Sequence, residues 1–140
     1  MKPELQQKLY ERYPKIFRQK DLPGTETCMN AGICMGDGWF HILDALCYSI
    51  QNFVRARNQM CPDEEPMVVE AVQVKEKSGT FRFYHTSRNP FINGLVRMAG
   101  AIASYTCERC GNPGQYSPSG RSVLCDACCT AGTNTIEDDK

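Results

Sequence analysis

Cysteines near the C-terminal end are the residues best suited to chemistry in this sequence. Cys107 and Cys110 form one Cys-x-x-Cys pair, and Cys125 and Cys128 form a second. Two intervening residues let both sulfurs of a pair point into one tetrahedral site, and two such pairs supply four sulfur ligands. The spacing therefore predicts one structural Zn²⁺ held by these four cysteines. Because four sulfurs leave no open position for water, we do not expect the metal to catalyse a reaction.

The second cysteine pair is less regular than the first. Gly111 directly follows Cys110 and suits the turn that closes the first loop, whereas Cys129 occupies the corresponding position after Cys128. Ligand spacing favours Cys128 over Cys129 as the fourth ligand, and both assignments stay open at this point. Reduced, unpaired thiols or a redox-active pair are the alternatives to a metal site.

Composition and charge limit the classes of function. A chain of 140 residues with a hydrophobic fraction of 41% suits one compact domain, or one domain plus a small module, with a core of its own. Sixteen Lys and Arg residues balance sixteen Asp and Glu residues. A strong non-specific nucleic-acid binder usually carries a basic excess, so this balance counts against such a function.

Nothing in the sequence predicts export or membrane insertion. The start of the chain has no apolar stretch typical of an export signal, and no run is long enough to cross a bilayer. We therefore expect a cytoplasmic protein without a membrane partner, in a reducing compartment where the nine cysteines act as metal ligands and buried thiols. Cys28, Cys34 and Cys61 could hold a second metal with a histidine, but their spacing matches no usual ligand pattern.

Periodic apolar residues predict the elements that position these side chains. Helices are expected over residues 3–13, over 38–60 with Asp37 as the N-cap, and from Asn89 to about residue 103. Residues 21–38 are rich in Gly, Thr, Asn and Asp, which predicts a loop.

The hairpin is predicted from the segment MVVEAVQVKEKSGTFRFYHT, in which two strands flank Ser78 and Gly79. A two-residue turn and a four-residue turn centred on Ser78 and Gly79 give the same register. This register pairs Lys77 with Thr80, Glu76 with Phe81, Lys75 with Arg82, Val74 with Phe83 and Gln73 with Tyr84. Strand alternation then directs Val72, Val74, Phe81 and Phe83 towards the helices.

The opposite face of the hairpin is the predicted partner-binding surface. It carries Lys75, Lys77, Arg82 and Tyr84, next to Gln73. Like charges that face each other across a strand pair oppose folding, so Lys75 opposite Arg82 suggests a contact with an acidic protein surface or with phosphates. An ordinary solvated face is the alternative.

These elements give the fold class α+β, with helices packed on an antiparallel β-hairpin and followed by a C-terminal zinc ribbon. We divide the chain into an α+β domain (1–104), whose core is large enough to fold alone, a zinc ribbon (105–132) and a polar flexible tail (133–140).

Two weaker patterns contain residue types that can act in catalysis. Gln73, Val74 and Lys75 on a strand, with Asp63, Glu64 and Glu70 upstream, have the residue types of a metal-dependent nuclease, but no partner strand supplies a further Asp. His41 and His85, the two histidines, have no obvious catalytic partner and are expected to be partly buried packing residues. We therefore predict that the protein is not an enzyme.

Three stretches in order resemble a family of small zinc-ribbon proteins encoded by bacteriophages and prophages, which largely lack an assigned function. They are CMGDGWFHILDALC, VVEAVQVKEKSGTFRFY and TCERCGNPG…LCDACC, and the resemblance runs from about Gly32 to Cys129. It implies a phage protein in the cytoplasm of a bacterial host, with an accessory role.

The function that this resemblance favours is stoichiometric binding to a host protein, including inhibition of nucleic-acid-handling defence machinery. It implies no small-molecule substrate. A zinc-ribbon regulator that binds DNA or RNA is the alternative, and a nuclease is the third possibility.

Overall fold

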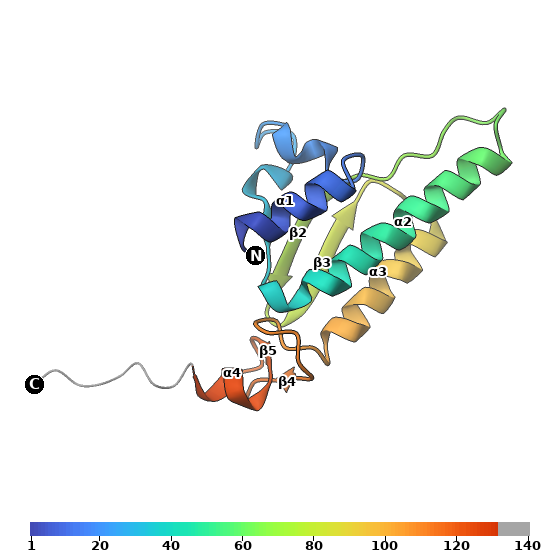
Figure 1. Cartoon of the computed structure of the whole chain (residues 1–140). Helices are drawn as coiled ribbons and strands as arrows, with labels where there is room; N and C mark the ends of the chain where they lie inside the picture. Colours follow the sequence, from blue (N-terminus) through green and yellow to red (C-terminus); the bar gives the residue numbers. More distant parts are fainter. Residues whose placement is uncertain (132–140) are drawn as a thin grey trace, which may run out of the picture.

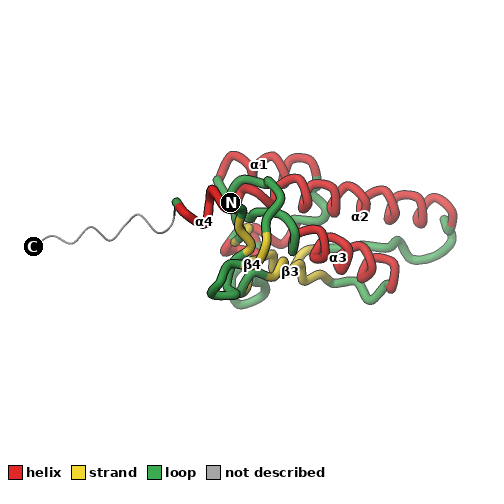
Figure 2. Tube along the Cα trace, turned by 90° about the horizontal axis from the view of Figure 1, so that it is seen from below, coloured by secondary structure: helices red, strands yellow, loops and turns green. Residues whose placement is uncertain are grey.

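Three helices and a small sheet form the main body of the chain. The computed structural model describes residues 1–131. Helices α1 (Pro3–Arg12) and α2 (Phe40–Met60) lie over one face of the sheet, while α3 (Pro90–Ala103) packs against α2 and the strand β3 (Thr80–His85) (Figure 1). The second view shows the same two layers, with α1 and α2 on one side and the strands on the other (Figure 2). Apolar side chains between the layers, such as Leu9, Trp39, Val74 and Ile92, are fully or almost fully buried.

The three longest helices within residues 1–131, α1, α2 and α3, are close to those predicted, whereas the short α4 (Asp126–Thr130) was not predicted. Asn89, predicted to begin α3, is its N-cap, because its side chain accepts hydrogen bonds from the backbone N–H groups of Phe91 and Ile92. None of the helices within residues 1–131 is long and apolar enough to cross a membrane.

Asp37 does not cap α2, contrary to the prediction. A 3₁₀ turn (Asp37–Trp39) precedes the helix, and α2 starts only at Phe40. The Asp37 side chain instead accepts a hydrogen bond from the backbone N–H of Lys2 at 2.8 Å, and so fixes the beginning of α1.

The predicted hairpin register is confirmed. Strands β2 (Ala71–Lys77) and β3 (Thr80–His85) pair as expected from Gln73–Tyr84 to Lys77–Thr80. Ser78 and Gly79 both have positive φ angles, 50° and 75°, which a two-residue turn of this handedness requires.

Val72 is not the inward-facing residue that strand alternation predicts. A bulge shifts the register between Ala71 and Gln73, so that Ala71 pairs with His85. One extra residue reverses which side chain points inward, and consequently Ala71 is fully buried while Val72 is only half-buried.

A third strand joins the sheet from the segment predicted to be a loop. β1 (Ile33–Cys34) pairs parallel to β2, with Ile33 beside Val74 and Cys34 beside Lys75. The sheet order is therefore β1-β2-β3, and the sheet is mixed instead of a lone antiparallel hairpin. Two residues are too few to show alternation in a sequence, but they supply hydrogen-bond partners to an otherwise open edge of β2.

The C-terminal segment packs against the end of the sheet where the hairpin turns (Figure 1). It contains a second, two-stranded sheet of β4 (Gln115–Tyr116) and β5 (Val123–Leu124). We call residues 105–131 the cysteine module. The predicted tail, 133–140, lies outside the described residues.

Contacts between the cysteine module and the rest of the chain are buried. Val123 is fully buried within the same hydrophobic core as the helices. The indole N–H of Trp39 donates to the carbonyl of Thr106 at 2.8 Å, and the backbone N–H of Gly38 donates to the carbonyl of Glu108 at 2.9 Å. The division at residue 104 therefore separates two parts that share one core.

A chain that ends at Tyr105 tests this sharing. We expect it to be destabilised by several kcal/mol, because it loses the hydrogen bond of the Trp39 indole, worth about 0.5–1.5 kcal/mol, and the burial of Val123, worth about 1.5–3 kcal/mol. Urea denaturation followed by the fluorescence of the one tryptophan measures the change. A chain ending at Ala131 keeps every contact named here and serves as the control. Equal stability of the two chains would show that residues 1–105 fold alone.

The hairpin turn provides a second test, because a Cβ added at Gly79 would lie 2.7 Å from the Tyr116 ring. Gly120 has a similar φ of +66° but open space around it. Gly120→Ala should therefore cost only the backbone penalty, roughly 1–2 kcal/mol. Gly79→Ala should cost about 1 kcal/mol more by overpacking. Adding Tyr116→Ala should remove that excess in chemical denaturation; an excess that persists would show that the ring does not restrain the turn.

Candidate metal centre

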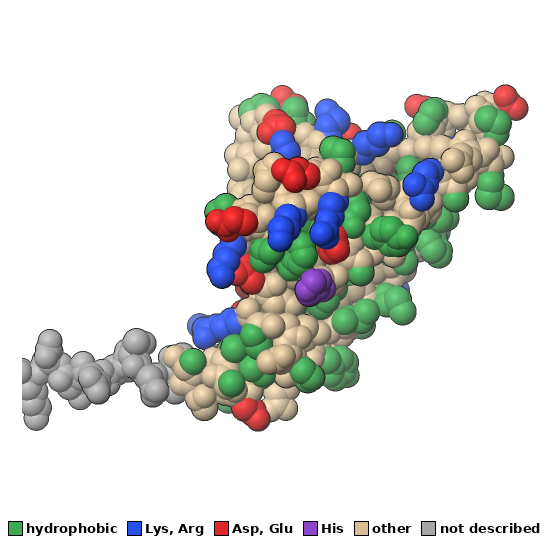
Figure 3. Space-filling model, viewed as in Figure 1, with side chains coloured by type: hydrophobic (Ala, Val, Ile, Leu, Met, Phe, Trp, Pro, Cys, Tyr) green, Lys and Arg blue, Asp and Glu red, His purple; other side chains and the backbone are tan. Residues whose placement is uncertain are grey.

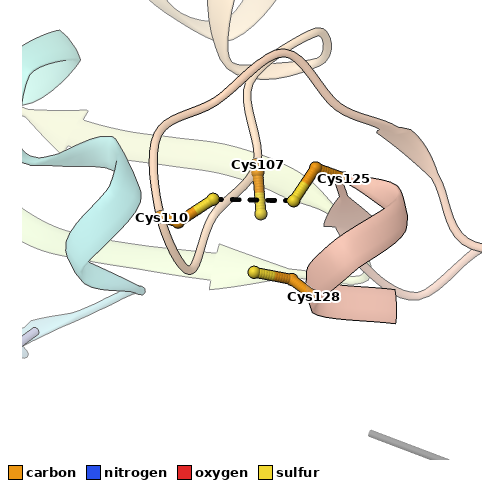
Figure 4. Close-up of side chains that lie close together, drawn as sticks. All are labelled: Cys107, Cys110, Cys125 and Cys128. Atoms are coloured by element: carbon orange, nitrogen blue, oxygen red, sulfur yellow. Dashed lines mark hydrogen bonds between the residues drawn. The ribbon is translucent and has the colours of Figure 1, made fainter. Parts of the chain in front are cut away.

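Four cysteine sulfurs converge at one point in the cysteine module. The ligand atoms of Cys107, Cys110, Cys125 and Cys128 all lie within 4.8 Å of one another (Figure 4). The sulfurs of Cys110 and Cys125 are 3.6 Å apart. Tetrahedral zinc with bonds of about 2.3 Å places its sulfurs about 3.8 Å apart, so the spacing suits a metal of that size. The four cysteines therefore form a site that could hold one metal ion.

The first two cysteines belong to a tight loop that follows α3. The backbone N–H of Gly111 donates to the carbonyl of Cys107 at 2.9 Å, and the N–H of Cys107 donates to the carbonyl of Asn112 at 2.8 Å. Gly111 has a φ of +80°, a conformation that glycine adopts without steric cost, as expected for the residue that closes this turn. Cys107 itself is fully buried, whereas Cys110 is exposed.

The last two cysteines sit at the start of α4. Cys125 immediately precedes the helix, and Cys128 lies in its first turn, so both sulfurs face the first loop (Figure 4). Cys129 is not part of the cluster. Its backbone N–H donates to the carbonyl of Cys125, which continues the helix. The geometry thus brings together the four residues that the spacing favoured, with Cys128 in the fourth position.

Hydrogen bonds prepare one sulfur to be a thiolate. Burial acts to raise the pKa of the Cys107 thiol, but backbone N–H groups of Cys125, Cys110 and Arg109 stabilise the thiolate and lower that pKa to about 6. In contrast, hydrogen bonds to the sulfurs of Cys125 and Cys110 raise the pKa of Cys128 to about 12. A metal ion must therefore displace protons from the cluster when it binds.

Two glycines at the end of the predicted loop, Gly36 and Gly38, allow a close approach to the first cysteine loop. A Cβ on Gly36 would lie 1.9 Å from the carbonyl oxygen of Glu108, and one on Gly38 would lie 2.2 Å from that of Cys107. Backbone atoms cannot meet at such distances, so these positions admit only glycine without a shift of the loop. The sequence contains Gly-Asp-Gly directly before Trp39, but it does not reveal that these glycines contact the backbone of Cys107 and Glu108.

Glu108 is a further feature that the sequence did not reveal. One oxygen of its carboxyl group is buried without a hydrogen-bond partner among residues 1–131. Burial, and then the nearby negative charge of Glu76, raise the pKa of this carboxyl group. The hairpin and the first cysteine loop therefore meet at two acidic side chains.

Three of the four residues of the predicted partner-binding surface are exposed. Lys77, Arg82 and Tyr84 are exposed, but Lys75 is half-buried because β1 runs beside it. Lys75 faces Arg82 across the strands as predicted. Among the ion pairs within residues 1–131, none involves Lys75, Lys77 or Arg82. Three positive charges on this surface thus lack an acidic partner within the described chain.

The residues considered for a nuclease are not gathered into a metal site. Glu70 accepts hydrogen bonds from Arg18 at 2.6 and 2.9 Å, and Arg18 lowers the pKa of its carboxyl group. Glu64 pairs with Arg57 at 2.5 Å in the connector after α2. The cysteine cluster is the one group of potential metal ligands found within residues 1–131.

The remaining candidates are dispersed. Cys28 and Cys34 are exposed and Cys61 is half-buried, and they form no ligand cluster in the described part of the chain. His85 is partly buried beside Phe83, as expected, and burial lowers the pKa of its imidazole. His41 is exposed, so its prediction as a packing residue is wrong: the side chain points outward from α2, next to Phe40.

Comparison with protein-family models, with curated proteins and with solved structures finds no match to this chain. The site is therefore interpreted from its own geometry.

Replacement of single cysteines tests the ligand set. Cys128→Ser should abolish tight binding of one metal ion per chain, whereas Cys129→Ser should retain it, because only Cys128 lies in the cluster. Metal analysis of purified protein, with and without acid treatment, measures both. Thiolates are reprotonated as the pH falls, so the ion should be released in acid and its binding should release protons. Loss of metal in Cys129→Ser but not in Cys128→Ser would show that Cys129, and not Cys128, is the fourth ligand.

Proposed function

We propose that the cysteine module holds one structural Zn²⁺ and that the protein acts by binding, without catalysis. Four thiolates around one Zn²⁺ fill a tetrahedral site and leave no position for water or substrate. The zinc would lock two loops together and keep the module in place against Trp39 and the hairpin turn. The chemistry of the metal is then a contribution to folding stability.

The binding partner that we propose is a host protein with an acidic surface. The observation that carries this proposal is the unpaired positive charge of Lys75, Lys77 and Arg82 on one face of the sheet. Exposed Tyr84 lies beside Arg82 on β3, and Tyr and Arg are the residue types most often found in energetically important contacts. We call this set of four residues the basic sheet face.

The biological setting that we propose follows the resemblance to phage zinc-ribbon proteins. In that setting the protein is an accessory protein of a bacteriophage or prophage in the cytoplasm of the bacterial host. It would bind a host protein with fixed stoichiometry and inhibit it, with nucleic-acid-handling defence machinery as the favoured target. Positive charges would accelerate the encounter with such a partner, and the effect would weaken with added salt.

A nucleic-acid-binding regulator is the second candidate, because the basic sheet face also has the composition of a surface for single strands. Arg, Lys and an exposed aromatic side chain on a sheet can contact phosphates and stack a base. The balance of sixteen basic and sixteen acidic residues counts against it.

The double variant Lys75→Gln/Arg82→Thr tests the basic sheet face. It removes two facing like charges, so the melting temperature should stay the same or rise slightly. Binding to the partner, recovered by pull-down from bacterial lysate and then purified, should weaken mainly through a slower association rate. Lys8→Gln/Lys15→Thr makes the same change of charge at two exposed positions of the N-terminal segment and should bind normally.

The outcomes separate the candidates. Normal binding by the hairpin variant, with weak binding by the N-terminal variant, would place the contact on the N-terminal segment. Direct binding of DNA or RNA that falls steeply with salt would favour the regulator. Metal-dependent cleavage of nucleic acid would contradict the non-catalytic proposal.

A further inference from the structure

An apolar surface on α3 is largely exposed, although the ring of Phe91 stacks on Phe53 of α2 with the centroids 4.5 Å apart. Phe91, Met98 and Ile102 are each more than half exposed, and so is Tyr105 in the turn that follows the helix. Hydrophobic side chains gather along the side of the molecule where α2 and α3 lie (Figure 3). A groove of about 290 Å³ between these two helices, lined by Ile42, Leu46, Leu95 and Ile102 among others, continues this surface.

The α3 surface is centred on Met98. At about 100° per residue, five further positions of the helix lie within roughly 60° of the direction of Met98. They are Phe91, Gly94, Leu95, Ala101 and Ile102, and Tyr105 lies in the turn that follows the helix. The opposite side of the helix packs into the core through Ile92, Ala99 and Ala103. The helix thus has two apolar sides, and only one of them is covered.

The order of small and large residues on either side of Met98 would allow a second copy of the same chain to pack on this surface. If two α3 helices pack antiparallel, residues equally distant from Met98 face each other. Small residues then meet large ones: Gly94 faces Ile102, and Ala101 faces Leu95. Met98 faces Met98 of the second copy.

The two small positions are open in the single chain. A Cβ added at Gly94 would have no atom within 4 Å, and Ala101 is exposed. A large side chain from another molecule therefore has room to pack over each of them. Arg97 is the one charged residue between Pro90 and Ala103, and it points about 100° away from Met98, so no like charges meet.

The area of the surface suits a weak dimer. Exposed fractions of 53% for Phe91, 64% for Met98, 51% for Ile102 and 76% for Tyr105 give about 500 Å² in total, taking roughly 200 Å² for each side chain. Gly94, Ala101 and the groove add to this and bring it towards the roughly 800 Å² that each partner buries in a standard interface. Patches of this size on a protein surface commonly mark an interaction site.

We propose that the protein forms a homodimer through α3, with the helices antiparallel and a two-fold axis beside Met98. In this dimer Ile102 of one copy packs over Gly94 of the other, and Leu95 packs over Ala101. The partner is a second copy of this chain because the surface is complementary to itself. The interface uses none of the residues of the basic sheet face and none of the four clustered cysteines.

Sedimentation velocity of the full, metal-loaded chain under reducing conditions tests this proposal over a concentration series. The parent should sediment as a dimer at the higher concentrations. Met98→Glu and Met98→Lys should each be folded, because Met98 is exposed, yet dimerise at least tenfold more weakly. An equimolar mixture of these two variants should recover the dimer, since the two-fold axis places position 98 against itself. Failure of the mixture to pair would overturn the proposed axis.

Gly94→Leu provides a second arm that does not depend on charge. It replaces an exposed glycine within a helix, so the single chain should be more stable, but the space for Ile102 is lost and the dimer should dissociate. Arg97→Leu, also exposed but off the α3 surface, should dimerise like the parent. A parent that is monomeric at every concentration would overturn the proposal. So would a monomer that binds lipid vesicles of phosphatidylglycerol or an amphipathic helical peptide, because that result would assign the surface to another occupant.

Discussion

The close approach of two backbone segments determines how the parts of this protein fit together. The turn at Gly36–Trp39 touches the loop that carries Cys107 and Cys110, and the indole of Trp39 donates a hydrogen bond across the contact. Any side chain at Gly36 or Gly38 would force the two backbones apart. Since α2 starts at Phe40, directly after this turn, the same contact sets both the start of the longest helix and the position of the cysteine module. The helical core and the cysteine cluster are therefore joined by direct backbone contacts.

Sequence patterns predicted well those features that depend on local spacing. The register of the hairpin followed from the position of Ser78 and Gly79, because a turn of this kind fixes every pair on the two strands. The four clustered cysteines followed from two equal spacings, and the start of α3 followed from Asn89 before a proline. In each case the determining residues lie within a few positions of one another.

The features that the sequence did not predict depend on contacts between distant segments or on a single inserted residue. β1 is formed by two residues, and its pairing with β2 is recognisable only once both are placed. The bulge at Val72 changes which side chain is buried without any change in composition. The exposure of His41, and the role of Gly36 in packing against Glu108, likewise depend on what lies opposite in space. Alternation and helical periodicity describe one element at a time and cannot supply this information.

The contact between Trp39 and Thr106 joins residues that are 67 positions apart in the chain. Closing so long a loop is entropically costly, so this part of the fold should form late during folding. The two cysteine pairs, in contrast, are each complete within four residues and can capture a metal ion in an unfolded chain. All four sulfurs lie within residues 107–128, so they can meet around an ion before the cysteine module docks on Trp39. Metal capture would then precede the final docking step, and an ion shared between two chains at that stage would be a kinetic trap during refolding at high protein concentration.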